Sequence, residues 1–237
     1  MLEVVPALDR REYSFLGSEA YEWILNAITS FALAVNAQLS DSKLSKEMGV
    51  SRTPVREALQ RLEKEGLVRR GPTSRFTVAL LTPREVDESC DVLAVLDSYI
   101  FCRAAERIDS VQALELMGCA EAMLSSAVRG DVKAWGIADS KFHEIVLQAS
   151  GNDIAADMAR QTRRRIHRFS TRALGAQANR FISCSSEHVG IAQQVLDGRV
   201  SDIPAMVNEH IEHMRLSVLD SLTAISNYLG LEIPPRT

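Results

Sequence analysis

The spacing of apolar residues in the first third of the chain predicts three helices followed by two strands. Tyr21, Ile24 and Ile28 recur at intervals of three or four, which places them on one face of a helix. Gly66 and the run Gly71-Pro72-Thr73-Ser74 interrupt the pattern as a helix end and a hairpin turn do. This order of elements is typical of a winged helix-turn-helix. The expected elements are an arm over residues 1–18, helices over 18–33, 41–48 and 53–65, and strands over 67–70 and 75–81.

From residue 82 onward the pattern predicts helices only. Thr82-Pro83-Arg84-Glu85 has the residues of a capping box with proline at the first helical position, so it indicates a helix start and a domain boundary. Turn-forming pairs such as Gly130-Asp131 and Gly151-Asn152 separate the later apolar stretches. We therefore expect a mainly α protein, in which a winged helix-turn-helix (19–81) precedes an antiparallel six-helix bundle (82–237). The expected bundle helices cover residues 83–107, 110–129, 131–149, 153–174, 179–197 and 201–229.

Charge and cysteine usage narrow the class of protein. The formal net charge of −4 argues against a polybasic protein that coats nucleic acid or membrane indiscriminately. The first 80 residues carry eleven basic and ten acidic side chains, and the rest carry sixteen and twenty-one, so only the N-terminal part is suited to face phosphates. The four cysteines form no CxxC pair, which suits a reducing compartment and thiols that act as small core groups. With no signal-like or membrane-spanning apolar run, we expect a cytoplasmic protein that does not contact membrane.

Two faces separate along the third expected helix. Val55, Leu59 and Leu62 form a stripe suited to burial, whereas Arg52 and Arg56 follow one another on a different face. Guanidinium groups near the start of a recognition helix can bind guanine N7 and O6 bidentately. The alternative is an ordinary helix with a solvated basic face, which charge alone does not exclude.

A longer string distinguishes these two interpretations. Gly49-Val50-Ser51-Arg52-Thr53-Pro54-Val55-Arg56-Glu57-Ala58-Leu59, followed by Leu62-Glu63 and Glu65-Gly66-Leu67-Val68, resembles the signature of the GntR family of bacterial transcription regulators. The resemblance covers about residues 20–81 and implies binding to an operator in double-stranded DNA. Where the family has glycine in the turn before the second helix, this chain has Asn36, which tolerates a positive φ nearly as well. The implied DNA contacts fall on Ser51, Arg52, Thr53 and Arg56, with Gly71 as the wing glycine, and the hairpin tip adds Ser74 and Arg75.

Four residues in the helical part have the chemistry of a metal site. Asp139 and His143 lie four apart on one helix, and therefore on the same side of it. His188 and His210 lie on the last two expected helices, with enough chain between them for both to face one cavity. One carboxylate and three imidazoles suit Zn²⁺, Ni²⁺ or a similar cation. By spacing alone each could instead be a surface or hydrogen-bonded residue, which is the interpretation kept for the other two histidines, His167 and His213.

The same positions also resemble a known domain. Asp139-x-x-x-His143 with Gly151-Asn152, Glu187-His188-x-x-Ile191, and Ala205-x-x-x-x-His210-Ile211 are similar to the FCD-type domain of the FadR subfamily within GntR. The resemblance implies a homodimer whose all-α domain holds a divalent metal (Zn or Ni) through Asp139, His143, His188 and His210, with a small organic acid as effector nearby. Six helices rather than seven resemble the VanR-like branch.

The effector contacts differ from the usual pattern of this domain. The arginine that such domains carry early in the bundle is replaced here by Ala94, three residues before Asp97. Replacement charge is available from consecutive arginines at 163–165, of which we expect at most two to face inward. Arg164 and Arg165 are the candidates for effector binding.

Three functions fit these observations. The first is a ligand-responsive regulator that binds a palindromic operator as a dimer. The second is a regulator for which the metal itself is the signal. The third is a metal-dependent hydrolase, because a metal with an open position can activate water. A hydrolase would leave residues 20–81 without a role, and the sequence has no general base or nucleophile at the spacing of a known catalytic motif. We therefore expect no enzymatic activity.

Overall fold

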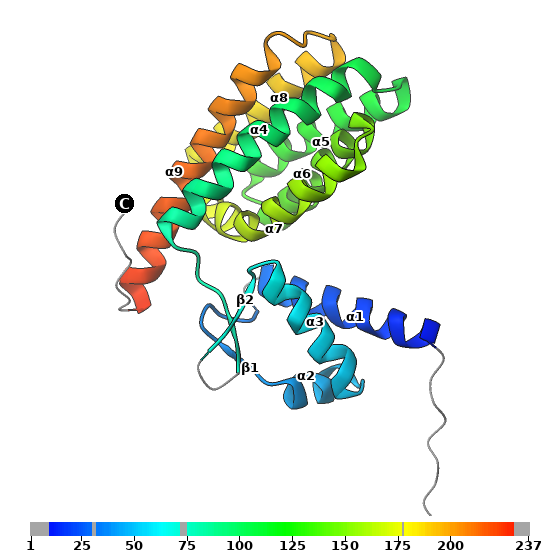
Figure 1. Cartoon of the computed structure of the whole chain (residues 1–237). Coiled ribbons are helices and arrows are strands. Elements are labelled where there is room, and N and C mark those ends of the chain that lie inside the picture. Colours follow the sequence, from blue (N-terminus) through cyan, green and yellow to red (C-terminus); the bar gives the residue numbers. More distant parts are fainter. Residues whose placement is uncertain (1–9, 30–31, 72–74, 177, 230–237) are drawn as a thin grey trace, which may run out of the picture. The chain divides into compact units, whose positions relative to one another are not determined.

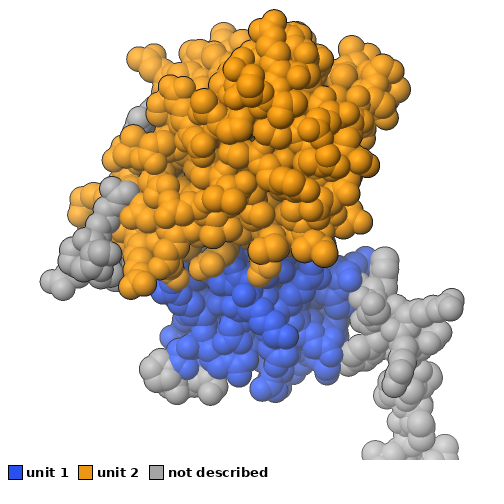
Figure 2. Space-filling view, turned by 45° about the horizontal axis from the view of Figure 1, so that its top comes forward, with its two compact units in different colours: residues 1–80 blue, residues 81–237 orange. Residues whose placement is uncertain are grey.

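The computed structural model describes residues 10–29, 32–71, 75–176 and 178–229. Contacts divide the chain into two compact units, Met1–Leu80 and Leu81–Thr237, which Figure 2 colours separately. The first contains helices and a small sheet, and the second contains only helices among its described residues (Figure 1). The division lies one residue from the expected boundary. No described helix is long and apolar enough to cross a membrane.

The first unit is a winged helix-turn-helix, as the sequence predicts. Its sheet has the order β1-β3-β2, with both pairs antiparallel. The hairpin of β2 and β3 was expected, but β1 was not, because two residues are too few to show an alternating pattern. Asn36 precedes β1 with a φ of 61°, the left-handed conformation expected for this turn. The elements are α1 (Arg10–Thr29), β1 (Gln38–Leu39), α2 (Asp41–Met48), α3 (Arg52–Lys64), β2 (Val68–Arg70) and β3 (Phe76–Val78).

Helix α1 differs most from the prediction. It begins at Arg10 and ends at Thr29, so the expected arm over residues 1–18 is wrong for residues 10–18, while residues 1–9 lie outside the described part. Gly17 lies inside this helix, and a glycine inside a helix costs only about 1 kcal/mol. The apolar spacing continues across it from Leu16 to Ala20, and packing therefore outweighs local propensity.

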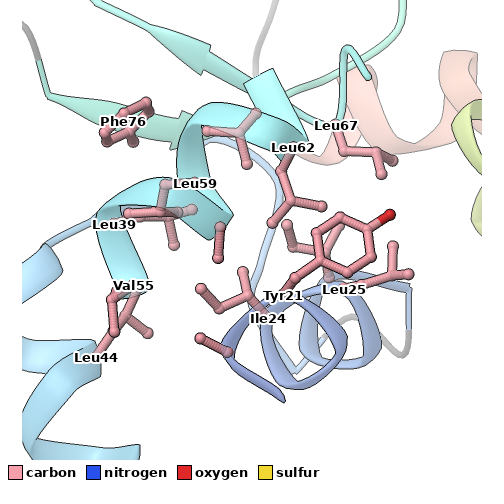
Figure 3. Close-up of a cluster of buried hydrophobic side chains, with 14 of the residues drawn as sticks. Tyr21, Ile24, Leu25, Leu39, Leu44, Val55, Leu59, Leu62, Leu67 and Phe76 are labelled. Atoms are coloured by element: carbon pink, nitrogen blue, oxygen red, sulfur yellow. The ribbon is translucent and has the colours of Figure 1, made fainter. Parts of the chain in front are cut away.

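The core of this unit fixes which face of α3 meets solvent (Figure 3). Tyr21 and Ile24 of α1 pack against Val55, Leu59 and Leu62 of α3, and all five are almost fully buried. Burying such a side chain contributes about 1.5–3 kcal/mol, so α3 is held in one rotational setting. Its arginines at 52 and 56 therefore lie on the exposed side.

The second unit is the expected six-helix bundle. The Thr82 hydroxyl accepts a hydrogen bond from the Glu85 backbone, and the Glu85 carboxylate accepts one from the Thr82 backbone, which completes the predicted capping box. Helix α4 packs against α6, α7, α8 and α9 and is thus central to the unit. The helices are α4 (Pro83–Arg107), α5 (Ser110–Arg129), α6 (Val132–Ser150), α7 (Asp153–Ala176), α8 (Ala178–Leu196) and α9 (Ile203–Leu229).

Candidate metal centre and nucleic-acid interface

The four candidate metal ligands come from three helices and lie together inside the bundle. Asp139 and His143 belong to α6, His188 to α8 and His210 to α9, and all four are buried. Asp139 Oδ1 lies 3.3 Å from His188 Nε2 and 3.5 Å from His143 Nε2. The rings of His188 and His210 have centroids 4.4 Å apart. A cavity adjoins them, and its wall also includes Trp135, Arg163, Arg180 and Cys184.

Neighbouring acceptors orient two of the imidazole rings. His188 Nδ1 donates to the backbone carbonyl oxygen of Cys184 at 2.8 Å, and His210 Nδ1 donates to Glu187 Oε2 at 2.8 Å. Because both partners can only accept, each neutral ring keeps its lone pair on Nε2. His188 Nε2 is buried and faces the Asp139 carboxylate. Three imidazoles and a carboxylate converge here, and Asp139, His143 and His188 have ligand atoms within 4.8 Å of one another, so these residues fit a divalent metal.

The ionisation of the cluster also favours a cation. Burial, followed by the Arg163 guanidinium, lowers the pKa of His143 to about 3, and burial with neighbouring His188 lowers the pKa of His210 to about 4. Burial also lowers the pKa of His188, but Asp139 and Cys184 raise it more, to a net value of about 10. One positive charge is therefore stable beside Asp139, and a bound metal would replace that proton.

Arg163 is the arginine that reaches the cavity. One of its terminal nitrogens donates to the buried Asp97 carboxylate, and Nη1 donates to His143 Nε2 at 3.2 Å. Arg164 and Arg165 are not among the described residues that line the cavity, and Arg165 Nη2 lies 3.7 Å from Glu85 Oε1. The expectation that Arg164 and Arg165 face the cavity is therefore corrected in favour of Arg163. Consecutive helical residues point about 100° apart, and apolar spacing alone does not show which of the three arginines faces inward.

The remaining two histidines are His167 and His213. The His213 ring donates from Nδ1 to Glu187 Oε1 at 2.9 Å and is partly exposed, in agreement with its expected hydrogen-bonded role. The side chain of His167 lies outside the described part of the structure.

The candidate DNA contacts lie at the exposed start of α3 and in the wing. Ser51 rather than Thr53 is the N-cap, and its hydroxyl makes no capping hydrogen bond. Both carboxylate oxygens of Asp41 accept from Arg52 Nη2, at 2.9 and 3.0 Å, while most of the Arg52 side chain remains exposed. Thr53 and Arg56 are exposed as well.

The wing candidates flank a tip that lies outside the described residues. Gly71 N donates to the Arg75 carbonyl at 2.9 Å, and Arg75 Nη1 donates to Gln38 Oε1 of β1 at 3.3 Å. Arg75 is exposed, and Ser74 falls within the undescribed residues 72–74. The described candidates therefore form two groups, one on α3 and one at the base of the wing.

Sequence reasoning missed the residues that hold the candidate side chains in place. Asp41, eleven residues before Arg52, accepts hydrogen bonds from its guanidinium, and local spacing gives no signal for this contact. Glu187 stood beside His188 in the quoted motif, but its contact with His210 crosses from α8 to α9 and has no signal in local spacing. Cys184 did have a signal, because it lies four residues before His188, the same interval that separates Asp139 from His143.

Comparison with known proteins places these features in a family. The chain matches the family "Bacterial regulatory proteins, gntR family" over residues 16–78 and the FCD domain over residues 88–213. An uncharacterized HTH-type transcriptional regulator of Agrobacterium vitis is 33% identical over 134 residues, which cover 55% of this chain and 78% of that protein. A gluconate operon transcriptional repressor of Bacillus licheniformis is 31% identical over 111 residues, which cover 47% of this chain and 45% of the repressor.

The solved structure of E. coli McbR/YncC has the same fold, with a TM-score of 0.77 at 19% identity over 86% of this chain and 97% of that one. The matched segment spans about half the length of the Bacillus repressor, so the comparison concerns the shared domains. The proteins matched are transcriptional regulators, not enzymes. The chain therefore belongs to the GntR family of bacterial transcription regulators and carries an FCD domain after its DNA-binding domain.

Proposed function

We propose that this regulator binds a palindromic operator as a homodimer and that a small carboxylate, bound beside a divalent metal in the helical unit, controls its affinity for DNA. The observation that carries the DNA half is the division of α3 into a buried apolar face and an exposed face with Arg52 and Arg56. The Asp41 carboxylate accepts hydrogen bonds only from Nη2 of the Arg52 guanidinium. A guanidinium held in this way loses less side-chain entropy when it binds a guanine edge.

Selection of duplexes from a random pool tests the operator. Two copies of α3 related by a two-fold axis would read half-sites centred about 10 base pairs apart, because that is one turn of the major groove. We expect the selected sequences to contain an inverted repeat with this spacing. Enrichment of a single half-site, or of no sequence, would contradict dimeric reading of a palindrome.

Exposed apolar side chains on two packed helices favour a dimer interface. Val92, Val95 and Tyr99 are exposed on α4, and Ile154 and Met158 are exposed on α7. Asn152 Nδ2, just before α7, donates to the Tyr99 hydroxyl at 3.1 Å, which brings the two groups onto neighbouring surfaces. Apolar patches of this kind are typical of protein–protein interfaces.

Val95→Glu is expected to convert the dimer to a monomer, because it places a charge among side chains that the second copy would bury. Sedimentation velocity gives the oligomeric state, and operator affinity should fall by at least about tenfold as the second recognition helix is lost. Val128→Glu is the matched control, since Val128 is equally exposed on α5. If the Val95 variant sediments as wild type does, α4 is not the interface.

Residues of the cavity suit a carboxylate effector. The ligand set Asp139, His143, His188 and His210 would hold the metal, which when bound supplies a Lewis-acidic position for one carboxylate oxygen. Arg163 lies beside this set, with its side chain 15% exposed, and offers charge-assisted hydrogen bonds to the same group. Arg163 of α7 would in this way replace the arginine that such domains carry on α4, where this chain has Ala94.

Arg163→Gln combined with Asp97→Asn removes both charges of this ion pair and leaves a neutral polar pair. We expect the affinity for acetate, lactate, malonate or citrate, whichever the wild type binds, to fall roughly tenfold to a hundredfold, because hydrogen bonds to charged groups contribute about 1.5–3 kcal/mol. Fluorescence of Trp135, which lines the cavity, reports the titration. Arg164→Gln is the control and should bind as wild type does. Equal losses in both variants would exclude a specific role for Arg163.

A further inference from the structure

The thiol of Cys184 lies in the cavity beside two of the candidate metal ligands. Cys184 is one turn before His188 on α8, is buried and forms part of the cavity wall. Ligand atoms of Cys184, His188 and His210 all lie within 4.8 Å of one another. The sulfur is 4.0 Å from His188 Nδ1, and the carbonyl of the same cysteine accepts the Nδ1 hydrogen. Cys184 therefore orients His188 through its backbone and offers a donor through its side chain.

The other described cysteines differ from Cys184. Burial raises the pKa of Cys90 to about 12, which suits an inert core thiol. Cys119 is buried on α5 near Lys141 and Glu115 rather than near histidine. Among the described residues, Cys184 is the cysteine found in a group with metal-ligand geometry.

The cavity contains two donor sets that share one ring. Asp139, His143 and His188 form an oxygen–nitrogen set that joins α6 to α8, and Cys184, His188 and His210 form a sulfur–nitrogen set that joins α8 to α9. The His188 ring lies between the two sets, with Nε2 3.3 Å from Asp139 Oδ1 and Nδ1 4.0 Å from the Cys184 sulfur. Thiolate favours soft or borderline cations, whereas carboxylate favours harder ones such as Mn²⁺.

We propose that Cys184 is a metal ligand and that the cavity distinguishes thiophilic cations, held through Cys184, His188 and His210, from harder cations, held through Asp139, His143 and His188 with His210 as the fourth ligand. Binding through Cys184 releases the thiol proton to solvent as the sulfur–metal bond forms. Because only the harder cations would be held by residues of α6, the two kinds of cation would stabilise different arrangements of the bundle. The effect of the two kinds of cation on DNA binding rests on the proposed regulatory function, whereas coordination by Cys184 does not.

Cobalt substitution tests the coordination directly. The full-length protein, freed of metal and loaded with Co²⁺, is expected to show a thiolate-to-cobalt charge-transfer band in the near ultraviolet together with ligand-field bands in the visible. Cys184→Ser should lose the first and keep the second, and Cys119→Ser should keep both. A charge-transfer band that survives in Cys184→Ser, or that is absent from wild type, overturns the proposal.

Competition between ions tests the discrimination. Cys184→Ser is expected to lower the affinity for Cd²⁺ by roughly tenfold to a hundredfold and to leave the affinity for Mn²⁺ unchanged. Removing a residue that only supports a metal ligand already costs this much, so the loss of a ligand should cost at least as much. Asp139→Asn should show the reverse pattern. Equal effects of each substitution on both ions would contradict two donor sets.

Operator binding separates this inference from the proposed function. If Co²⁺ binds Cys184 but neither Cd²⁺ nor Mn²⁺ alters operator affinity, the coordination stands and regulation by metal fails. If operator affinity responds to the ions without a thiolate band, regulation by metal stands and the role of Cys184 fails.

Discussion

Arg52→Ala combined with Arg56→Ala is expected to lower affinity for the selected operator by roughly 2–6 kcal/mol, since each bidentate contact with guanine contributes about 1–3 kcal/mol. This corresponds to a loss of about thirtyfold to more than ten-thousandfold. Both side chains are on the exposed face of α3, and the buried face is unchanged, so the fold should persist. Fluorescence anisotropy with the operator and with a scrambled duplex gives the specific and non-specific affinities.

Lys64→Ala provides the matched control for this double variant. Lys64 is an exposed basic residue in the last turn of the same helix, away from the N-terminal end that reads bases. Its loss should weaken binding to operator and scrambled duplex alike, because a phosphate contact carries no sequence information. If the double arginine variant also loses equally on both duplexes, Arg52 and Arg56 contact phosphates and do not read bases.

His188→Ala is expected to abolish stabilisation of the protein by metal, because His188 belongs to both donor sets. An ion at a hundred times its dissociation constant stabilises the folded state by about 2.7 kcal/mol. For a chain of this size that raises the midpoint of thermal unfolding by roughly 5–11 °C. Differential scanning calorimetry of metal-free protein, with and without Zn²⁺ or Mn²⁺, measures the shift in wild type and its loss in the variant.

His213→Ala is the control for this second experiment. Its ring contacts Glu187 but lies outside both donor sets. The His213 variant should keep most of the wild-type shift. A full shift in the His188 variant would mean that metal binds elsewhere, whereas no shift in wild type would mean that the cavity does not bind these ions.

Elements with local signals were predictable from the sequence. The start of α4 follows from the capping box at Thr82 and Glu85, and the ends of α5 and α6 follow from Gly130 and Gly151, which both adopt positive φ. These signals act within one helical turn, and tertiary contacts do not alter them.

Features that depend on distant contacts were not predictable in this way. Strand β1 exists because Gln38 and Leu39 pair with Thr77 and Phe76, almost forty residues later.

The candidate site shows the same division. The interval between Asp139 and His143 places both on one side of α6, and the three helices that carry the candidate ligands are predicted from the sequence. That the four ligands converge was inferred from the resemblance to a family. The choice of Arg163 over its neighbours depends on the rotation of α7 against α4, where Asp97 accepts its hydrogen bond. Rotation of a helix by one residue would bring a different arginine inward, and apolar spacing does not fix it so finely.

The central claim is that ligands in the cavity control binding to DNA. Its most direct test measures the affinity of the protein for its operator with and without saturating metal and carboxylate. We expect the operator affinity to change by about 5- to 150-fold, with an equal reciprocal change in ligand affinity when the operator is bound. An operator affinity that stays the same for every ion and acid that demonstrably binds the cavity would contradict the coupling.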